Sequence, residues 1–143
     1  MVLLEMTAAD DFSAYESFVA SVMRPEDFYT ADELCGHILS GYVTAWWTKD
    51  GAGAPVGWCG MENWNDEWKG ACNFLGVAVA PAWRNTGLAL RLIRHVVRRA
   101  GTRPLTAYIQ PGVETERLLE PGGFRYVKAH DPWRLYVREQ VRL

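Results

Sequence analysis

No apolar run in this chain approaches the roughly 20 residues that a helix needs to cross a lipid bilayer. A basic segment followed by an apolar one, the layout of a signal peptide, is also missing from the first residues, MVLLEMTAADDF. We therefore expect no membrane partner and a cytoplasmic location.

Cysteine is scarce, and its three residues are spread apart at Cys35, Cys59 and Cys72. The odd number and the lack of a CxxC pair argue against a disulfide framework and against a zinc site. A catalytic cysteine would need a partner base, and none of the three histidines lies in a local motif that supplies one. We predict reduced, partly buried thiols and no bound metal.

Charge of one sign is not in excess either, since the formal net charge is -2. No long-range attraction to nucleic acid or to an anionic membrane follows from that balance. The 143 residues are 49% hydrophobic and 22% charged, which is typical of a folded protein with a sizeable core. The length predicts a single domain over residues 1–143.

The first half of the chain predicts a strand, two helices, a β-hairpin and a further strand. Thr7 with Asp10, and Thr30 with Glu33, have the spacing of capping boxes, which mark helix starts. Residues that favour strands then dominate from Tyr42 onward. In chain order the expected elements are a strand at residues 2–6, a helix ending before Pro25, a helix ending at Gly41, and strands at residues 42–48, 56–63 and 71–79.

The second half contains the most regular pattern in the sequence, with Leu88, Leu92 and Val96 on one stripe. Such spacing predicts an amphipathic helix over residues 88–100. The remaining elements are expected as strands at residues 105–109, 124–127 and 133–137 and a short helix at residues 113–119. This order predicts an α/β (α+β) fold in which helices flank a central mixed β-sheet, with a right-handed parallel crossover through the long helix.

A short loop leads from the strand at residues 71–79 into the long helix, and its residues suit an anion. The first amides of a helix have no internal partner, and the helix dipole places partial positive charge beside them. Gly87 and the small Ala89 leave room for a phosphate to approach the backbone, and Arg84 adds a forked cation. A nucleotide P-loop is disfavoured because no GKS or GKT follows, and a Rossmann site because the glycine triad is missing.

At this loop, Arg84-Asn85-Thr86-Gly87-Leu88-Ala89 resembles the central motif of the GNAT acyltransferases: Gln or Arg, two residues, Gly, one residue, then Gly or Ala. The element order also fits that family from end to end. The resemblance implies a GNAT acyl-CoA N-acyltransferase fold, with acetyl-CoA or another acyl-CoA as co-substrate and no metal. The implied donor residues are Val77, Val79, Arg84, Asn85, Thr86, Gly87, Leu88 and Ala89.

The resemblance also implies how the donor lies. The coenzyme A pyrophosphate would sit on the amides of residues 85–89, and the pantetheine arm would pair with the strand through Val77 and Val79. In the family this strand splays from the next one, here residues 105–109, and the acceptor amine enters through the gap. The amine attacks the thioester carbonyl directly, and the backbone N–H of Val77 would stabilise the oxyanion.

The sequence departs from the family near the C-terminus. Gly123-Phe124 matches the end of a family pattern in which a tyrosine protonates the departing thiolate, but Leu119 stands at the tyrosine position. A thiolate is a good leaving group, so loss of this acid need not abolish turnover. Tyr108 and Tyr126 are nearby in sequence as alternative acids, and packing at an edge is the other interpretation of each.

The amine must be neutral to attack, which calls for a general base or a water chain that leads to one. Glu62, at the end of the second hairpin strand, is the first candidate, and a solvated strand-end carboxylate is the other interpretation. Asn73 lies where some relatives carry a catalytic glutamate, and it could hold a water. We therefore predict Glu62, Asn73 and Tyr126 as the catalytic set.

Tryptophans crowd the middle of the chain, interleaved with carboxylates. Most tryptophans pack in cores and at edges, but aromatic walls with carboxylates also suit a cationic or aromatic amine. Exposed members could equally line a homodimer interface. The stretch contains Trp46, Trp47, Trp58, Trp64 and Trp68 with Glu62, Asp66 and Glu67.

The outer face and exit of the long helix are basic. Such a run is usually a solvated face, although it could receive the 3′-phosphate of coenzyme A or a nucleic-acid backbone. Because the whole chain is acidic, we rank nucleic acid below a small-molecule amine as the partner. The basic residues are Arg91, Arg94, His95, Arg98, Arg99 and Arg103.

These patterns together predict an enzyme that transfers an acetyl or short acyl group from acyl-CoA to a primary amine of a small molecule or peptide. Two alternatives stay open. A non-catalytic acyl-CoA-binding or interaction module would explain Leu119, and a GNAT toxin that acetylates aminoacyl-tRNA would explain the basic helix face.

Overall fold

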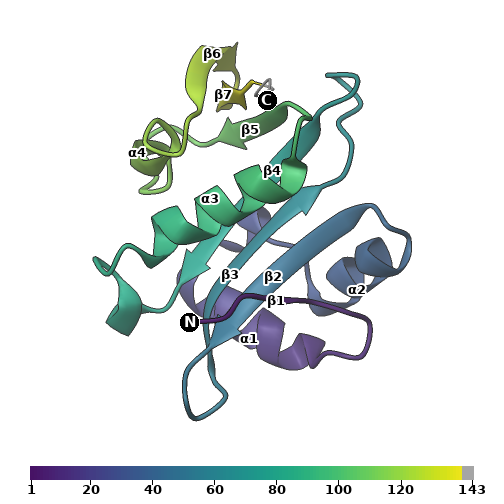
Figure 1. Ribbon diagram of the computed structural model, residues 1–143, viewed down its shortest axis with the longest axis vertical. Helices are drawn as coiled ribbons and strands as arrows, with labels where there is room; N and C mark the ends of the chain where they lie inside the picture. Colours follow the sequence, from purple (N-terminus) through teal and green to yellow (C-terminus); the bar gives the residue numbers. More distant parts are fainter. Residues whose placement is uncertain (140–143) are drawn as a thin grey trace.

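Within residues 1–139, which the structure describes, seven strands form one mixed sheet with helices on both of its faces (Figure 1). The structure is a computed structural model. Its elements are β1 (Leu4–Glu5), α1 (Phe12–Val22), η1 (Pro25–Asp27), α2 (Ala31–Leu39), β2 (Val43–Lys49), β3 (Pro55–Glu62), β4 (Cys72–Val79), η2 (Pro81–Trp83), α3 (Leu88–Ala100), β5 (Leu105–Ile109), α4 (Glu116–Leu119), β6 (Arg125–His130) and β7 (Trp133–Arg138). The strand order is β1-β2-β3-β4-β5-β7-β6, and β4 with β5 is the parallel pair among the described strands. The predicted mixed sheet flanked by helices is confirmed.

Local capping residues set the starts of α1 and α2. The cap of α2 is the predicted one, and the cap of α1 is not. Thr30 and Glu33 form the predicted capping box of α2, each side chain accepting the other's backbone N–H. At α1 the cap is Asp11, whose side chain accepts an amide of the first turn. The expected start at Thr7 is wrong, because Asp10 accepts the Thr7 amide at 2.7 Å within a turn that precedes the helix.

The sheet separates two hydrophobic cores. Trp46 and Trp47 are neighbours on β2, so their side chains point to opposite faces and enter different cores. The first core contains Leu92 of α3, and the second contains Val19 of α1. The amphipathic stripe predicted for α3 is thus the side of that helix that covers the sheet.

The parallel strands β4 and β5 pair at only two positions, Cys72 with Leu105 and Asn73 with Thr106. Beyond that last rung β4 continues to Val79 with β3 alone, and the two strands separate (Figure 1). The gap that the family resemblance implied is therefore present at the centre of the sheet.

A β-bulge in β4 lies beside this gap. Gly60 and Met61 are consecutive on β3, but their partners, Gly76 and Phe74, are two residues apart on β4. Leu75 therefore has no partner on β3. An inserted residue of this kind bends the strand and disrupts the ladder locally, which places irregular backbone at the edge of the gap.

The three cysteines are free thiols, with Cys59 and Cys72 buried and Cys35 half-buried, in agreement with the predicted burial. Across residues 1–139, none of the helices has both the length and the apolar character needed to span a bilayer. The same residues contain no group of three or more His, Cys, Asp or Glu side chains placed to hold a metal ion.

Candidate active site

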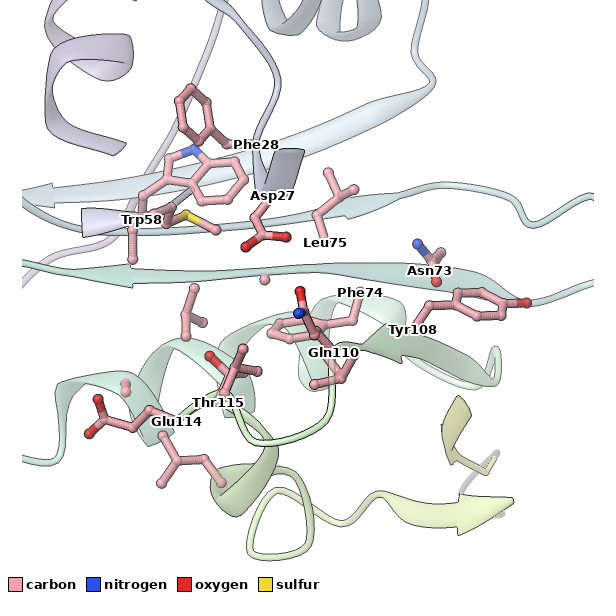
Figure 2. A pocket seen from close by; sticks show the side chains of 18 of the residues that line it. Asp27, Phe28, Trp58, Asn73, Phe74, Leu75, Tyr108, Gln110, Glu114 and Thr115 are labelled. Atoms are coloured by element: carbon pink, nitrogen blue, oxygen red, sulfur yellow. The ribbon is translucent and has the colours of Figure 1, made fainter. Parts of the chain in front are cut away.

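An open cleft of about 1130 Å³ follows the gap between β4 and β5 (Figure 2). Figure 2 shows Leu75 and Asn73 along β4, with Gln110 and Tyr108 across from them. Asp27, from η1, lies over the middle of the cleft. A concave site of this size is suited to a small molecule or a cofactor.

At one end the cleft reaches the loop between β4 and α3, where two residues have left-handed backbone angles. Asn85 has a φ of 60°, and Gly87, the N-cap of α3, has a φ of 84°. A Cβ added to Gly87 would meet nothing within 4 Å, so the space beside this backbone is open. Arg84 is exposed and takes part in no ion pair of residues 1–139. Together with the unpartnered amides of the first helical turn, these features suit an anion.

Most of the residues predicted for the donor line this cleft. Thr86 does not, because its hydroxyl donates to the carbonyl of Trp83 at 2.5 Å and its side chain lies outside the lining. The predicted residues that do line the cleft are Val77, Val79, Arg84, Asn85, Gly87, Leu88 and Ala89.

Backbone amides of β4 point into the gap. Ala80 donates its N–H to the carbonyl of Val56 on the β3 side, at 2.9 Å. Amides two residues apart on a strand point the same way, so the N–H of Ala78 also faces β3. Val77 and Val79 therefore direct their N–H groups toward the side that β5 leaves open. An extended ligand in the gap could pair with them as a strand would.

At the other end of the cleft, the carboxylate of Glu62 accepts three hydrogen bonds from neutral groups. Tyr29 and Tyr42 donate their hydroxyls to Oε2 at 2.6 and 2.7 Å, and Asn73 donates its amide to Oε1 at 2.7 Å. Within residues 1–139 no Lys, Arg or His nitrogen lies within 4 Å of this carboxylate. A half-buried anion without a cationic partner can take its counter-ion from a ligand.

The two phenols beside Glu62 are held in their protonated form. Burial, the hydrogen bond to Glu62 and the charge of Glu62 raise the pKa of Tyr29, and the same causes raise the pKa of Tyr42. Both therefore serve as donors. The ring of His37 lies between them, with centroid distances of 4.6 and 5.2 Å, and Trp64 packs on Tyr42 at 4.7 Å. The carboxylate is thus bordered by a continuous aromatic wall.

The structure brings Glu62 and Asn73 together, as neighbours across β3 and β4. Both polar atoms of the Asn73 amide are hydrogen-bonded: Nδ2 donates to Glu62, and Oδ1 accepts the hydroxyl of Thr106 at 2.9 Å. Asn73 therefore orients the carboxylate of Glu62 directly, a contact that the sequence did not predict.

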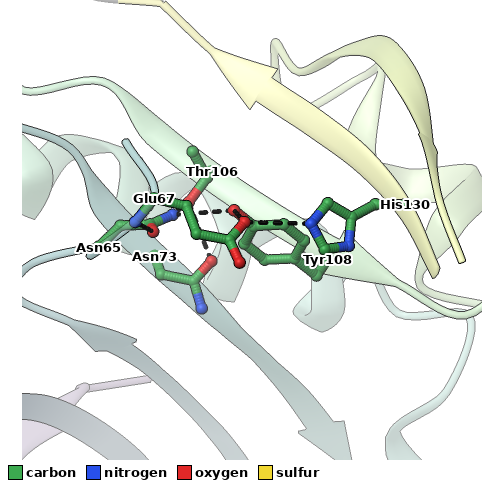
Figure 3. Close-up of polar contacts among 6 residues, drawn as sticks. All are labelled: Asn65, Glu67, Asn73, Thr106, Tyr108 and His130. Carbon is green, nitrogen blue, oxygen red and sulfur yellow. Dashed lines mark hydrogen bonds and ion pairs between the residues drawn. The ribbon is translucent and has the colours of Figure 1, made fainter. Parts of the chain in front are cut away.

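A second polar group at the same end of the cleft was also not predicted as a set (Figure 3). Tyr108 donates its hydroxyl to Oε2 of Glu67 at 3.2 Å, and Nε2 of His130 lies 3.0 Å from the same oxygen. Burial is the main cause that raises the pKa of Tyr108. The three side chains come from separate segments of the chain, so no local spacing could have revealed the group.

Tyr126, the third predicted catalytic residue, is not brought to the cleft. It lies on β6 with 48% of its surface exposed, and its ring packs against Tyr136 at 5.6 Å. Leu119, at the position of the family tyrosine, is fully buried in the core beneath α3. Tyr108 is the tyrosine of this half of the chain that lines the cleft.

The tryptophan-rich stretch divides between core and cleft. Trp46 and Trp47 are buried in the two cores, and Trp58 is buried with one side on the cleft. Trp64 is 49% exposed and lines the cleft, whereas Trp68 lies outside it. The aromatic wall beside Glu62 is thus supplied by Trp64 and the tyrosines, with the ring of His37 between the tyrosines.

The sequence matches the acetyltransferase (GNAT) family over residues 8–118. This match spans more than half of the chain, and the protein belongs to the GNAT family of acetyltransferases, as the loop motif predicted. A comparison with curated proteins gave no significant match.

Solved structures share the fold along nearly the whole chain. A GNAT-family protein from Desulfovibrio desulfuricans is 23% identical with a TM-score of 0.73, covering 96% of this chain and 98% of its own. A chimeric spermidine N-acetyltransferase from Vibrio cholerae is 15% identical with a TM-score of 0.75, covering 97% and 95%. The phosphinothricin acetyltransferase of Sinorhizobium meliloti, solved with acetyl-CoA, is 18% identical with a TM-score of 0.73, covering 97% and 88%.

Proposed function

We propose that this protein transfers an acetyl or other short acyl group from acyl-CoA to the primary amine of a small molecule or peptide. The amine attacks the thioester directly in a ternary complex. The observation that carries the proposal is a continuous cleft that joins the open loop at Gly87 to the carboxylate of Glu62, across the divergence of β4 and β5.

The donor end of the cleft supplies the groups that a pyrophosphate needs. Amides of the first turn of α3 point out of the helix, Gly87 leaves open space beside them, and Arg84 adds a cation with no internal partner among the described residues. The N–H groups of Val77 and Val79 face the gap, where they can pair with the amides of a pantetheine arm. The thioester then lies near the bulge at Leu75.

The acceptor end favours a cationic amine. A primary amine is protonated at neutral pH, so it arrives as a cation. Glu62 offers an anion whose described partners are all neutral, and Trp64 offers an exposed ring face for a cation–π contact. Glu62, directly or through a water, takes the proton that the amine must lose before it attacks.

The leaving group needs little help. A thiolate leaves readily because a free thiol has a pKa of about 8.5. The oxyanion of the tetrahedral intermediate receives the N–H of Val77, which faces the gap. Burial of Leu119 therefore does not exclude turnover.

Calorimetric titration of acetyl-CoA into the wild type and an Arg84→Glu variant tests the donor end. Placing a like charge against the pyrophosphate should weaken binding by about 100-fold. Arg125→Glu makes the same charge change on β6, outside the cleft, and should bind as the wild type does. No binding to the wild type, or equal losses in both variants, would remove the basis for the donor site.

Thiol release from acetyl-CoA across a panel of amines tests the acceptor end. Glu62→Gln should lower kcat/KM by about 100-fold, and Trp64→Ala should raise the amine KM by about tenfold. Trp68→Ala, which lies outside the cleft, is the matched control for the loss of an indole. Tight acetyl-CoA binding without turnover on any amine would support the non-catalytic acyl-CoA-binding module instead.

A further inference from the structure

The side-chain amide of Asn65 makes three hydrogen bonds at the acceptor end of the cleft (Figure 3). Its Oδ1 accepts the backbone N–H of Glu67 at 2.8 Å, and its Nδ2 lies 2.8 Å from Oγ1 of Thr106 and 3.2 Å from the hydroxyl of Tyr108. A backbone N–H can only donate, so the oxygen of Asn65 must face Glu67 and the NH₂ must face the other two. The orientation of this amide is therefore fixed by chemistry.

The first branch runs from Asn65 to Glu62. Thr106 is fully buried on β5, and because its oxygen accepts from Asn65, its own proton is free for Oδ1 of Asn73, at 2.9 Å. The carbonyl of Cys72, at 3.1 Å, is the alternative acceptor for that proton. Asn73 then donates its Nδ2 to Oε1 of Glu62 at 2.7 Å. When Thr106 donates to Asn73, the nearer of its two acceptors, every bond of this branch points toward the carboxylate.

The second branch runs from Asn65 to Glu67. Tyr108 accepts from Asn65 and donates its hydroxyl to Oε2 of Glu67. His130 contacts that same oxygen at 3.0 Å. One amide thus stands at the head of two directed chains, and each chain ends on a carboxylate that lines the cleft.

Directed chains of this kind orient groups and do not conduct protons. Each hydrogen bond polarises the next, so a donor at the head strengthens the bond at the carboxylate. An amide NH₂ does not release its proton at neutral pH, and Asn73 interrupts any proton path to Glu62. The two hydrogen-bond chains therefore set the orientation of the carboxylates of Glu62 and Glu67.

We propose that Asn65 is a positioning residue that holds Glu62 and Glu67 in the orientation that receives the acceptor amine. This inference rests on the proposed function, since it assigns the two carboxylates to the acceptor. Asn65 itself touches neither the carboxylate of Glu62 nor the reacting atoms, and it acts through Thr106 and Tyr108.

The Asn65→Asp variant tests this role with almost no change in shape. A carboxylate at this position can only accept, so Thr106 and Tyr108 would turn their protons toward it and away from the two chains. Asn63→Asp is the matched control, because Asn63 also hydrogen-bonds locally, to Gly41 and Thr44, but lies outside the cleft. Both variants lose local bonds, and only one breaks the chains.

The first measurement is independent of turnover. The chain has four asparagines, so ¹⁵N-asparagine labelling resolves the side-chain amide of Asn73. Asn65→Asp should shift the Asn73 NH₂ resonances, and Asn63→Asp should leave them in place. Unchanged Asn73 resonances in Asn65→Asp would overturn the inference whatever the protein acylates.

The second measurement is kinetic, with acetyl-CoA and the best amine of the panel. Asn65→Asp should raise the amine KM by about tenfold while the KM for acetyl-CoA stays within about twofold. An amine KM equal to that of Asn63→Asp would overturn the positioning role. If no amine is acylated by the wild type, the proposed function fails, and the resonance shift still decides whether the chain exists.

Variants of Thr106, which lies between Asn65 and Asn73 in the first branch, test the inference if Asn65→Asp does not fold. Thr106→Val keeps the shape of the buried side chain, adds no charge and removes the hydroxyl. It should therefore shift the Asn73 NH₂ resonances and raise the amine KM, as Asn65→Asp does. Thr106→Ser restores the hydroxyl and should recover both readouts. If Thr106→Val changes the Asn73 resonances and the amine KM, and Thr106→Ser does not restore them, the effect comes from packing and the inference is overturned.

Discussion

The hydroxyl of Tyr42 lies 2.7 Å from Oε2 of Glu62, on the far strand of the same hairpin. Tyr29 reaches the same oxygen at 2.6 Å from the connection between α1 and α2. The helical layer and the sheet are thus joined at one carboxylate. A site built this way depends on two phenols remaining protonated.

Tyr42 makes the stability of the protein sensitive to alkaline pH. Its pKa is raised by burial, by the hydrogen bond to Glu62 and by the charge of Glu62. A tyrosine whose pKa is higher in the folded state favours folding while it is protonated, so this contribution is complete below about pH 10 and is lost as the pH rises further. We expect the free energy of unfolding to fall above that pH, and to fall less in Tyr42→Phe.

Urea unfolding at about pH 8 and about pH 11 measures this difference. Tyr126→Phe is the control, because Tyr126 is exposed on β6 and donates to no carboxylate of residues 1–139. It should keep the pH dependence of the wild type. A Tyr42→Phe variant with the same alkaline loss as the wild type would show that this phenol is not coupled to Glu62.

Replacing Gly87 should lower the affinity for acetyl-CoA as well as the stability of the fold. Its φ of 84° is costly for a side chain, while the space around it is open, so Gly87→Ala should destabilise the protein by about 1 kcal/mol through backbone strain alone. Gly41 has a φ of 79°, is equally open and lies outside the cleft. Gly41→Ala should cost a similar free energy of unfolding and leave acetyl-CoA affinity unchanged. Calorimetry on the two variants separates strain from binding, and equal affinities would refute a donor role for Gly87.

The parts of the protein that could be predicted from the sequence are those set by residues close together in the chain. The stripe of Leu88, Leu92 and Val96 has helical spacing, and α3 spans the predicted residues, Leu88–Ala100. The position of the loop with Gly87 follows directly, because this loop is the N-terminus of the helix. Thr30 with Glu33 is equally local, and its capping box is present.

The parts that could not be predicted depend on register between strands. Glu62 was identified as a strand-end carboxylate, but its partners Tyr29, Tyr42 and Asn73 come from three other segments. The amide of Asn65 makes a local bond to Glu67, but its contacts to β5 cross about 40 residues of chain. Nothing in the spacing of single residues carries that information.

The three thiols should differ in reactivity in the folded protein. Cys59 and Cys72 are buried, and burial raises the pKa of both, so little thiolate is present or accessible. Cys35 on α2 is only half-buried. A colorimetric thiol reagent should therefore titrate about one thiol per chain in native buffer and all three in denaturant. Rapid reaction of two or more native thiols would contradict the packing of β3 and β4 described above.

Replacing Leu119 with tyrosine should not create the missing general acid. Leu119 is fully buried, and its surroundings are tight, since a Cβ built on nearby Gly122 would lie 2.7 Å from Ile93. A tyrosine there must be accommodated in the core, at about 1–3 kcal/mol of unfolding free energy, with its hydroxyl turned away from the cleft. We expect Leu119→Tyr to lose stability in urea and to gain nothing in kcat for thiol release. Leu118→Tyr, whose position lines the cleft, should lose less stability. A stable Leu119→Tyr variant with a higher kcat would contradict this prediction. It would mean that α4 can turn this side chain toward the thioester, where the tyrosine serves as a general acid.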